Sequence, residues 1–161
     1  MAVQDFKAAR ALALITPLAL LAGAYLSQYA FGLHPCEMCW WQRYPHFAAI
    51  VLALLAFLRP PGRAFVALAA AAIAASGLIG GFHAGVEYGW WQGLTSCAAS
   101  FHAGGGDPLD AIMNAPLVRC DVAPWSLLGV SLAGWNFLIS LGVAAAIAVS
   151  LARAAPSRIA A

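Results

Sequence analysis

Four long apolar runs, separated by short polar segments, dominate this sequence. The first, residues 11–32, carries no charged side chain and follows a short polar start that contains Lys7 and Arg10. A helix needs about 20 apolar residues to cross the hydrocarbon core of a bilayer, so this run predicts a membrane span. A cleaved signal peptide is the alternative, but the run is longer than the usual apolar region of roughly 7–15 residues.

A proline-rich turn separates the second and third runs. The second run is long enough only if its helix starts just after Glu37, which predicts a span over residues 38–58 and places Cys36 and Cys39 at its start. Two consecutive prolines in the segment 59–63 prevent the helix from continuing. The third span is predicted over residues 64–86, where many alanines and glycines allow close helix–helix approach in lipid.

A long polar loop and one more apolar run complete the chain. The loop is expected over residues 87–124 and the fourth span over residues 125–152. The predicted fold is an all-α membrane protein, a four-transmembrane-helix bundle that forms a single integral membrane domain over residues 1–161. Its two cysteine-bearing loops, residues 33–43 and 87–124, are expected on the same, extracytoplasmic side.

The second loop contains a short helix signal. In Asp107-Pro108-Leu109-Asp110-Ala111-Ile112-Met113, an aspartate stands at the N-cap position and a proline at the first helical position. Apolar residues on one face of this segment predict an interfacial helix that lies flat on the membrane.

The composition excludes an ordinary soluble domain. Only 9% of the 161 residues are charged and 63% are hydrophobic, with a mean hydropathy of +0.83, whereas a soluble domain is about a quarter charged. The net charge of +2 is too small to predict nucleic-acid binding. The expected state is a monomer surrounded by membrane lipid.

The distribution of charge predicts the topology. If four spans alternate, the positive residues on one side are Lys7, Arg10, Arg59, Arg63, Arg153 and Arg158. Positive charge in short loops marks the cytoplasmic face, so both termini are predicted to be cytoplasmic. Five tryptophans gather at the predicted outer boundary, as in an aromatic belt. They are Trp40, Trp41, Trp90, Trp91 and Trp125.

The four cysteines lie in or beside the two predicted outer loops. They are Cys36, Cys39, Cys97 and Cys120. Outside a bacterial plasma membrane the compartment is oxidising and disulfides persist, whereas cysteines that were only apolar filler would be scattered through the spans. A link between Cys97 and Cys120 would be approachable by another protein, as an exchanging disulfide must be; a static structural staple is the alternative.

A metal site is the competing interpretation of the first cysteine pair. The nominal ligands near it in the loops are His34 and His102. A second Cys-x-x-Cys or a His-x₃-His spacing is missing, so no metal is predicted.

Cys36 and Cys39 stand on one face at the start of a predicted helix. Backbone N–H groups and the helix dipole favour thiolate over thiol there. Arg43 follows Cys39 by four residues, so its positive charge shares that face. A charge this close to the bilayer is costly and usually functional, although an arginine that reaches the lipid headgroups is the alternative. Cys39 is therefore the predicted reactive sulfur.

Other polar residues occur in the spans. His83 and Glu87 are four apart at the outer end of the third span and are expected to contact a headgroup or a ligand. His46 and Asn136, within the second and fourth spans, more often form helix–helix hydrogen bonds than catalytic sites.

Taken together, these motifs resemble the DsbB family of disulfide bond formation proteins. The matching segments are Cys36-Glu37-Met38-Cys39-Trp40-Trp41-Gln42-Arg43, the outer pair Cys97 and Cys120, and Cys120-Asp121-Val122-Ala123-Pro124-Trp125 before the last span. A Cys-x-x-Cys alone is a weak signal, but the following Gln-Arg and the second outer pair make it specific. The resemblance covers almost the whole chain.

The resemblance implies a thiol relay at the bacterial inner membrane. A reduced, periplasmic, DsbA-like thioredoxin-fold protein would attack the Cys97–Cys120 disulfide and form a mixed disulfide with Cys97. Cys120 would then attack Cys36 and release Cys39 as a thiolate.

The resemblance also implies a quinone, either ubiquinone or menaquinone, as the electron acceptor. Arg43 would polarise a quinone carbonyl and stabilise the Cys39 thiolate, and Gln42 would donate a further hydrogen bond. A DsbA-like couple is already strongly oxidising, at about −120 mV, so its reoxidation needs a stronger acceptor than glutathione.

Three other readings remain open at this point. The chain could serve one dedicated thioredoxin-fold substrate, or it could be a quinone enzyme that resembles vitamin-K-epoxide reductase. It could also be a non-catalytic four-span scaffold with cross-linked outer loops.

Overall fold

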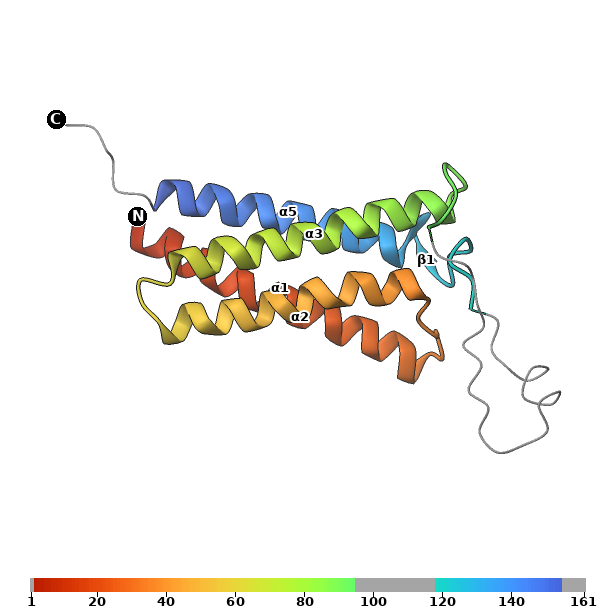
Figure 1. The fold of residues 1–161 in the computed structure, drawn as a ribbon, viewed down its shortest axis with the longest axis horizontal. Coiled ribbons are helices and arrows are strands. Elements are labelled where there is room, and N and C mark those ends of the chain that lie inside the picture. The colour runs from red at the N-terminus through yellow and green to blue at the C-terminus, as the bar shows by residue number, and fades with distance from the viewer. Residues whose placement is uncertain (1, 95–117, 155–161) are drawn as a thin grey trace.

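Four long helices run side by side as a bundle in the computed structural model, which describes residues 2–94 and 118–154 (Figure 1). They are α1 (Ala2–Ala30), α2 (Glu37–Leu58), α3 (Arg63–Glu87) and α5 (Leu132–Arg153). Each is long and apolar enough to cross a membrane. The prediction of an all-α, four-span membrane protein is confirmed. The predicted interfacial helix at residues 107–113 and Cys97 lie outside the described residues.

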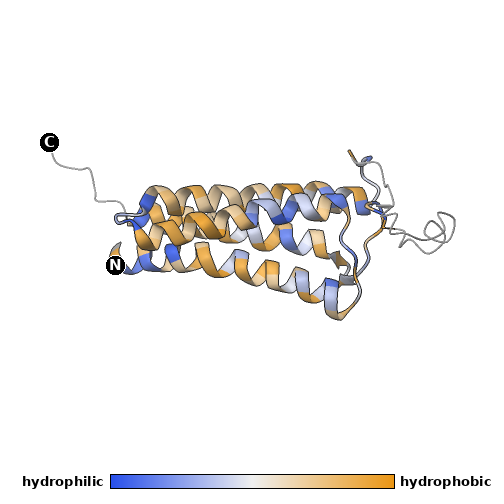
Figure 2. Ribbon diagram, turned by 60° about the horizontal axis from the view of Figure 1, so that its bottom comes forward, coloured by the Kyte–Doolittle hydropathy of each residue, from blue (hydrophilic) through white to orange (hydrophobic). Residues whose placement is uncertain are grey.

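Each helix has two main neighbours. α3 packs against α2 and α5, and α1 packs against the same two helices from the opposite side, so that α1 and α3 lie diagonally across the bundle. The beginning of α1, the α2–α3 turn and the end of α5 lie together at one end, and the Cys-bearing start of α2 lies at the other (Figure 1). Hydrophobic residues, coloured orange, cover most of the helix bundle between its two ends (Figure 2).

The predicted spans 38–58 and 64–86 match α2 and α3 to within a residue at each end. The first span, expected from residue 11, instead begins at Ala2 because the preceding alanines favour helix even though the segment is polar. The guanidinium of Arg10 in this extension lies 4.1 Å from the centre of the Phe57 ring. Gly32, with φ of +66°, follows the end of α1.

The predicted start of the fourth span, residue 125, is wrong. Residues Ser126–Leu127 (β1) and Val130–Ser131 (β2) pair as a two-stranded antiparallel hairpin, and α5 begins only at Leu132. Leu128 and Gly129 have φ of 53° and 77°, the left-handed conformation at both central positions that a two-residue hairpin turn requires. This apolar stretch therefore satisfies its backbone groups as a turn instead of a helix.

Two side chains hold the hairpin against the helices. The Ser131 hydroxyl caps α5 by accepting a hydrogen bond from the Gly134 N–H at 3.1 Å. The Tyr88 hydroxyl, just after α3, donates to the Gly129 carbonyl and accepts from the Ser131 N–H, each at 3.0 Å. The hairpin thus closes the end of the bundle where the cysteines lie.

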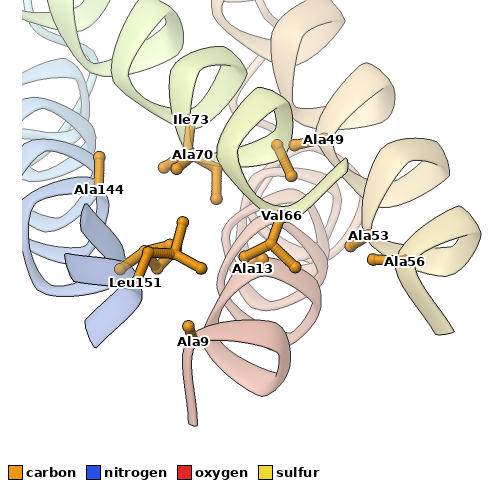
Figure 3. Packing of buried hydrophobic residues seen from close by; sticks show 12 residues of the cluster. Ala9, Ala13, Ala49, Ala53, Ala56, Val66, Ala70, Ile73, Ala144 and Leu151 are labelled. Atoms are coloured by element: carbon orange, nitrogen blue, oxygen red, sulfur yellow. The ribbon is translucent and has the colours of Figure 1, made fainter. Parts of the chain in front are cut away.

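Small residues dominate the core of the opposite half of the bundle. Val66 and Ile73 of α3 lie among alanines from the neighbouring helices (Figure 3). Alanine keeps helix backbones close together, and in lipid such close packing replaces the hydrophobic effect as the source of helix association.

The close approach of α3 to α5 predicts a sharp effect of one added methyl group. A Cβ at Gly80 would lie 2.9 Å from the Ala133 carbonyl oxygen and 3.0 Å from Asn136 Nδ2. We expect Gly80→Ala to destabilise the bundle by about 1–3 kcal/mol, the usual cost of overpacking, measured as a lower thermal transition in detergent.

Gly142 provides the matched control, because a Cβ there meets nothing within 4 Å. Gly142→Ala should leave the transition unchanged or raise it, since alanine is the better helix former by up to about 1 kcal/mol. Equal thermal transition temperatures for Gly80→Ala and Gly142→Ala would contradict the tight contact between α3 and α5.

Candidate active site

The Cys36–Cys39 pair lies at the N-terminus of α2, as predicted. Cys36 is the N-cap residue, and its Sγ accepts a hydrogen bond from the Cys39 N–H at 3.3 Å. The two Sγ atoms are 2.9 Å apart, with the Cys36 thiol donating to Cys39. Cys36 is buried and Cys39 is half-buried. The helix start therefore presents a reduced cysteine pair that shares one proton, and this proton is carried by one of the two sulfurs.

The proton of this pair belongs to Cys36. Its hydrogen bond to Cys39, together with burial, raises the pKa of the Cys36 thiol to about 12. His83 acts in the opposite direction but with a smaller effect. Cys36 consequently stays protonated at neutral pH and stabilises negative charge on its neighbour.

The proton retained by Cys36 predicts that an alkylating reagent will distinguish between the two cysteines of the reduced protein. The thiolate is the nucleophile, so iodoacetamide at about pH 8 should modify Cys39 and spare Cys36. The initial rate at Cys36 should rise about tenfold per pH unit, because its thiolate fraction grows steadily below a pKa of about 12. Peptide mass spectrometry would measure both rates; equal rates at about pH 8 would contradict the assignment.

His83 and Glu87 turn inward, toward the dithiol. His83 is buried, and its Nε2 lies 3.6 Å from Cys36 Sγ and 3.8 Å from Glu87 Oε1. On the other side of the ring, the Gln42 amide donates to Nδ1 at 2.9 Å. The imidazole proton therefore sits on Nε2, between the sulfur and the carboxylate. Both side chains are only 2% exposed, so this pair faces the site instead of the lipid headgroups.

A chain of polar side chains continues from Gln42 into the bundle. Asn136 Nδ2 donates to Gln42 Oε1 at 2.9 Å, and Asn136 Oδ1 lies 3.0 Å from His46 Nε2. The Ser76 hydroxyl contacts the same imidazole nitrogen at 2.9 Å. The expected helix–helix hydrogen bond of His46 and Asn136 is confirmed, and it links α2, α3 and α5 behind the site.

Arg43 is buried and held by α1 and by aromatic rings. Its Nη1 donates to Gln28 Oε1 at 2.8 Å, and its guanidinium carbon lies 4.8 Å from the ring centres of both Tyr25 and Trp40. Such contacts fix the planar guanidinium in one orientation. With an exposed fraction of 6%, the residue does not reach out to the headgroups, so the alternative reading of Arg43 is not supported.

A cavity of about 250 Å³ lies beside these groups and is lined by residues of α1, α2, α3 and α5, with His83 and Glu87 contributed by α3. Its polar lining includes Cys39, Gln42, Arg43, His46 and Asn136. Leucine and alanine side chains of α1 and the backbone of Gly23, with Leu132 and Ala133 of α5, form its apolar wall. The cavity therefore combines a reactive sulfur, a fixed positive charge and an apolar surface.

Cys120 is the member of the second cysteine pair that lies within the described residues. Cys120 is buried in one cluster with Cys36, Met38 and Val86, so the outer segment brings it against the first pair. Its backbone also interacts with His83. Cys120 therefore lies in the same buried cluster as Cys36, the residue that the family resemblance implies it would attack.

The comparison with known families is specific. The family model described as "Disulfide bond formation protein DsbB" matches residues 6–150. The chain belongs to the DsbB family.

Curated relatives agree with this assignment. A "Disulfide bond formation protein B" of Aromatoleum aromaticum is 34% identical over 140 residues, which covers 80% of this chain and 81% of the relative. A protein of the same name from an Azoarcus species is 34% identical over 150 residues and covers 83% and 84%. No solved structure matches the chain significantly. This DsbB-family member is therefore a disulfide-forming oxidoreductase with four membrane-spanning helices.

Some residues of the DsbB-family site were not predicted from the sequence. Tyr25 and Gln28 of α1 contact the Arg43 guanidinium. The sequence did contain an indication of these two residues. Gln28 is a polar residue within an uncharged run, and Tyr25 stands three residues before it on the same helix face. Ser76 was missed for a different reason, because a single serine in a helix of small residues carries little information.

Proposed function

We propose that this protein oxidises a periplasmic, DsbA-like thioredoxin-fold protein and passes the electrons to a membrane quinone. It would do so in the bacterial inner membrane, with both termini cytoplasmic and the cysteine-bearing loops periplasmic. The observation that carries the proposal is the shared cavity of Cys39 and Arg43, which is closed on one side by the apolar wall of α1.

The cavity suits a quinone chemically. A quinone has a flat apolar ring with two carbonyl oxygens, and when bound it accepts two electrons and two protons. Arg43 would hold one oxygen, because its guanidinium lines the cavity and has five N–H donors. The N–H groups of Gln42, which was predicted to help, already donate to the Met38 carbonyl and to His83 Nδ1. Among the described residues, buried His46 Nδ1 has no hydrogen-bond partner, and His46 lines the same cavity. Because Nε2 donates to Asn136 Oδ1, the neutral ring carries no proton on Nδ1, so that nitrogen can accept a hydrogen bond from a ligand hydroxyl but cannot donate one to a quinone carbonyl.

The residues of the first pair have different tasks in this proposal. Cys39 is the sulfur that faces the quinone cavity, whereas Cys36 faces the cluster that contains Cys120. A Cys120 thiolate would attack Cys36, form a new S–S bond and break the bond from Cys36 to Cys39. Cys39 leaves as a thiolate, favoured by the α2 N-terminus and the positive charge of Arg43.

The outer pair would receive the electrons first. A thiolate of the reduced partner would attack Cys97 and release Cys120 from a Cys97–Cys120 disulfide. The burial of Cys120, at 4% exposed, argues against direct attack on that sulfur by a second protein.

Quinone reduction by the purified protein tests the proposal. The full chain in detergent is given a reduced DsbA-like protein together with a soluble ubiquinone or menaquinone analogue. Loss of quinone absorbance should match the partner disulfide formed, one for one. A non-catalytic scaffold would leave both quinones oxidised, and that result would overturn the proposal.

A further inference from the structure

We propose that the reduced dithiol, His83 and Glu87 form a binding site for a thiophilic divalent cation such as Zn²⁺. The site exists only while the Cys36–Cys39 pair is reduced. Its ligands Cys39, His83 and Glu87 also line the quinone cavity, but cation binding does not depend on the proposed electron acceptor.

The ligand atoms are already gathered. The sulfurs of Cys36 and Cys39 and the imidazole nitrogens of His83 bring one ligand atom each to within 4.8 Å of one another. Zinc binds sulfur at about 2.3 Å and imidazole nitrogen at about 2.0–2.1 Å, so a tetrahedral centre separates such ligands by about 3.5 Å. The observed distance from Cys36 Sγ to His83 Nε2 is 3.6 Å. The two sulfurs, 2.9 Å apart, would need to separate slightly.

Glu87 provides a second, independent indication. Its side chain is 2% exposed, and Oε1 lies 3.8 Å from His83 Nε2. The other oxygen, Oε2, is buried without a hydrogen-bond partner among the described residues. A buried carboxylate oxygen without a partner is costly. Glu87 lies outside the group of three ligands that are already close together, so its side chain would turn toward them to satisfy this oxygen and complete a set of two thiolates, one imidazole and one carboxylate.

A cation can reach these ligands. A cavity of about 400 Å³ is lined by Cys36, Cys39, His83 and Glu87 together. Its remaining lining comes from the α1–α2 loop and from the outer segment that includes Arg119 and Val122. Since Arg119 is about half exposed, this cavity borders the outer end of the protein instead of the lipid-facing side of the bundle.

Binding changes the protonation of the site. Cys36 must lose the proton that the pair shares before it can become a ligand, so one proton leaves for every cation bound. The His83 proton moves from Nε2 to Nδ1, which faces the Gln42 amide at 2.9 Å. After a half-turn of its terminal group, with a matching turn of Asn136, that amide accepts a hydrogen bond from Nδ1–H through its oxygen and so supports the ligand from the outer shell.

The redox state controls the site. A Cys36–Cys39 disulfide has no thiolate to offer, so the oxidised protein should not hold the cation. Conversely, a bound cation occupies both sulfurs and keeps the pair reduced. Sequence spacing suggested only His34 and His102 as partners of the cysteines; His83, which lies 47 residues from Cys36 in the chain, is brought in by the packing of α3 against α2.

Cobalt binding tests this site directly. The full chain carrying Cys97→Ala and Cys120→Ala is reduced with a phosphine and titrated with Co²⁺ in detergent, without quinone. We expect one Co²⁺ per protein, with the thiolate-to-metal charge-transfer and intense tetrahedral d–d absorption, and its displacement by Zn²⁺. The same protein with the Cys36–Cys39 disulfide should show neither band.

Single variants identify the remaining ligands. Glu87→Gln and His83→Gln should each weaken Co²⁺ binding at least tenfold, whereas His34→Gln, which lines the same cavity, should not. Reduced protein without the bands, or equal bands in the oxidised protein, would overturn the proposal. So would a loss of affinity in His34→Gln as large as that in His83→Gln. The oxidised and reduced forms of one protein give an answer even where a variant does not fold.

Discussion

Cys39→Ser is expected to reduce quinone-linked oxidation of the DsbA-like partner to the background rate. Cys39 is the member of the pair that lines the cavity beside Arg43, and its neighbour Cys36 keeps its proton because the pKa of that thiol is raised to about 12. A serine hydroxyl cannot form the disulfide through which the electrons leave. The measurement is the initial rate of quinone absorbance loss with saturating reduced partner.

Glu37→Gln is the matched control for this variant. Glu37 stands between the two cysteines in the first turn of α2, but its side chain is exposed. Its removal should retain most of the activity. Full activity of Cys39→Ser would instead show that another sulfur delivers the electrons, and the role given to Cys39 would be lost.

Arg43→Ala is expected to raise the Michaelis constant for quinone by about tenfold to a hundredfold. A hydrogen bond to a charged group contributes about 1.5–3 kcal/mol, and each 1.4 kcal/mol corresponds to a factor of ten. The guanidinium is preorganised by Gln28 and by the rings of Tyr25 and Trp40, so its orientation is part of this contribution. Arg43→Lys should have an intermediate effect, because lysine keeps the charge but loses the planar fork.

The Michaelis constant for the reduced partner should change little in Arg43→Ala, since Arg43 is buried between α1 and α2. Arg119→Ala is the control. That arginine is exposed, pairs with Asp121 through contacts of 2.9 and 2.6 Å, and does not line the quinone cavity. An unchanged quinone constant in Arg43→Ala would contradict its role.

The helices could be predicted because their signal is local. In lipid each backbone group must be satisfied within its own segment, so an apolar run of sufficient length specifies a helix without knowledge of its neighbours. The same local reasoning failed at the start of the fourth span. The run there was apolar, but the turn at Leu128 and Gly129 allowed two short strands to pair before Ser131 capped α5.

The site was predictable to the same extent. Cys36, Cys39 and Arg43 are close in the chain, and helix periodicity alone placed them on one face at the start of α2. The inward orientation of His83 and Glu87 was not predictable, because the alternative contact with headgroups uses the same helix position. The choice depends on Gln42 and Cys36, which belong to another helix.

By itself, the sequence determined the four membrane-spanning helices and the position of a reactive dithiol at the start of the second. It did so because hydropathy, helix capping and i,i+4 spacing act over a few residues. Only the tertiary structure decided what surrounds that dithiol. It places the buried His83 and Glu87 of α3 beside the sulfurs, holds Arg43 by hydrogen bonding to α1, and connects Gln42 to Asn136 of α5. These contacts depend on how four separate helices are rotated against each other, and that packing is not contained in any single segment.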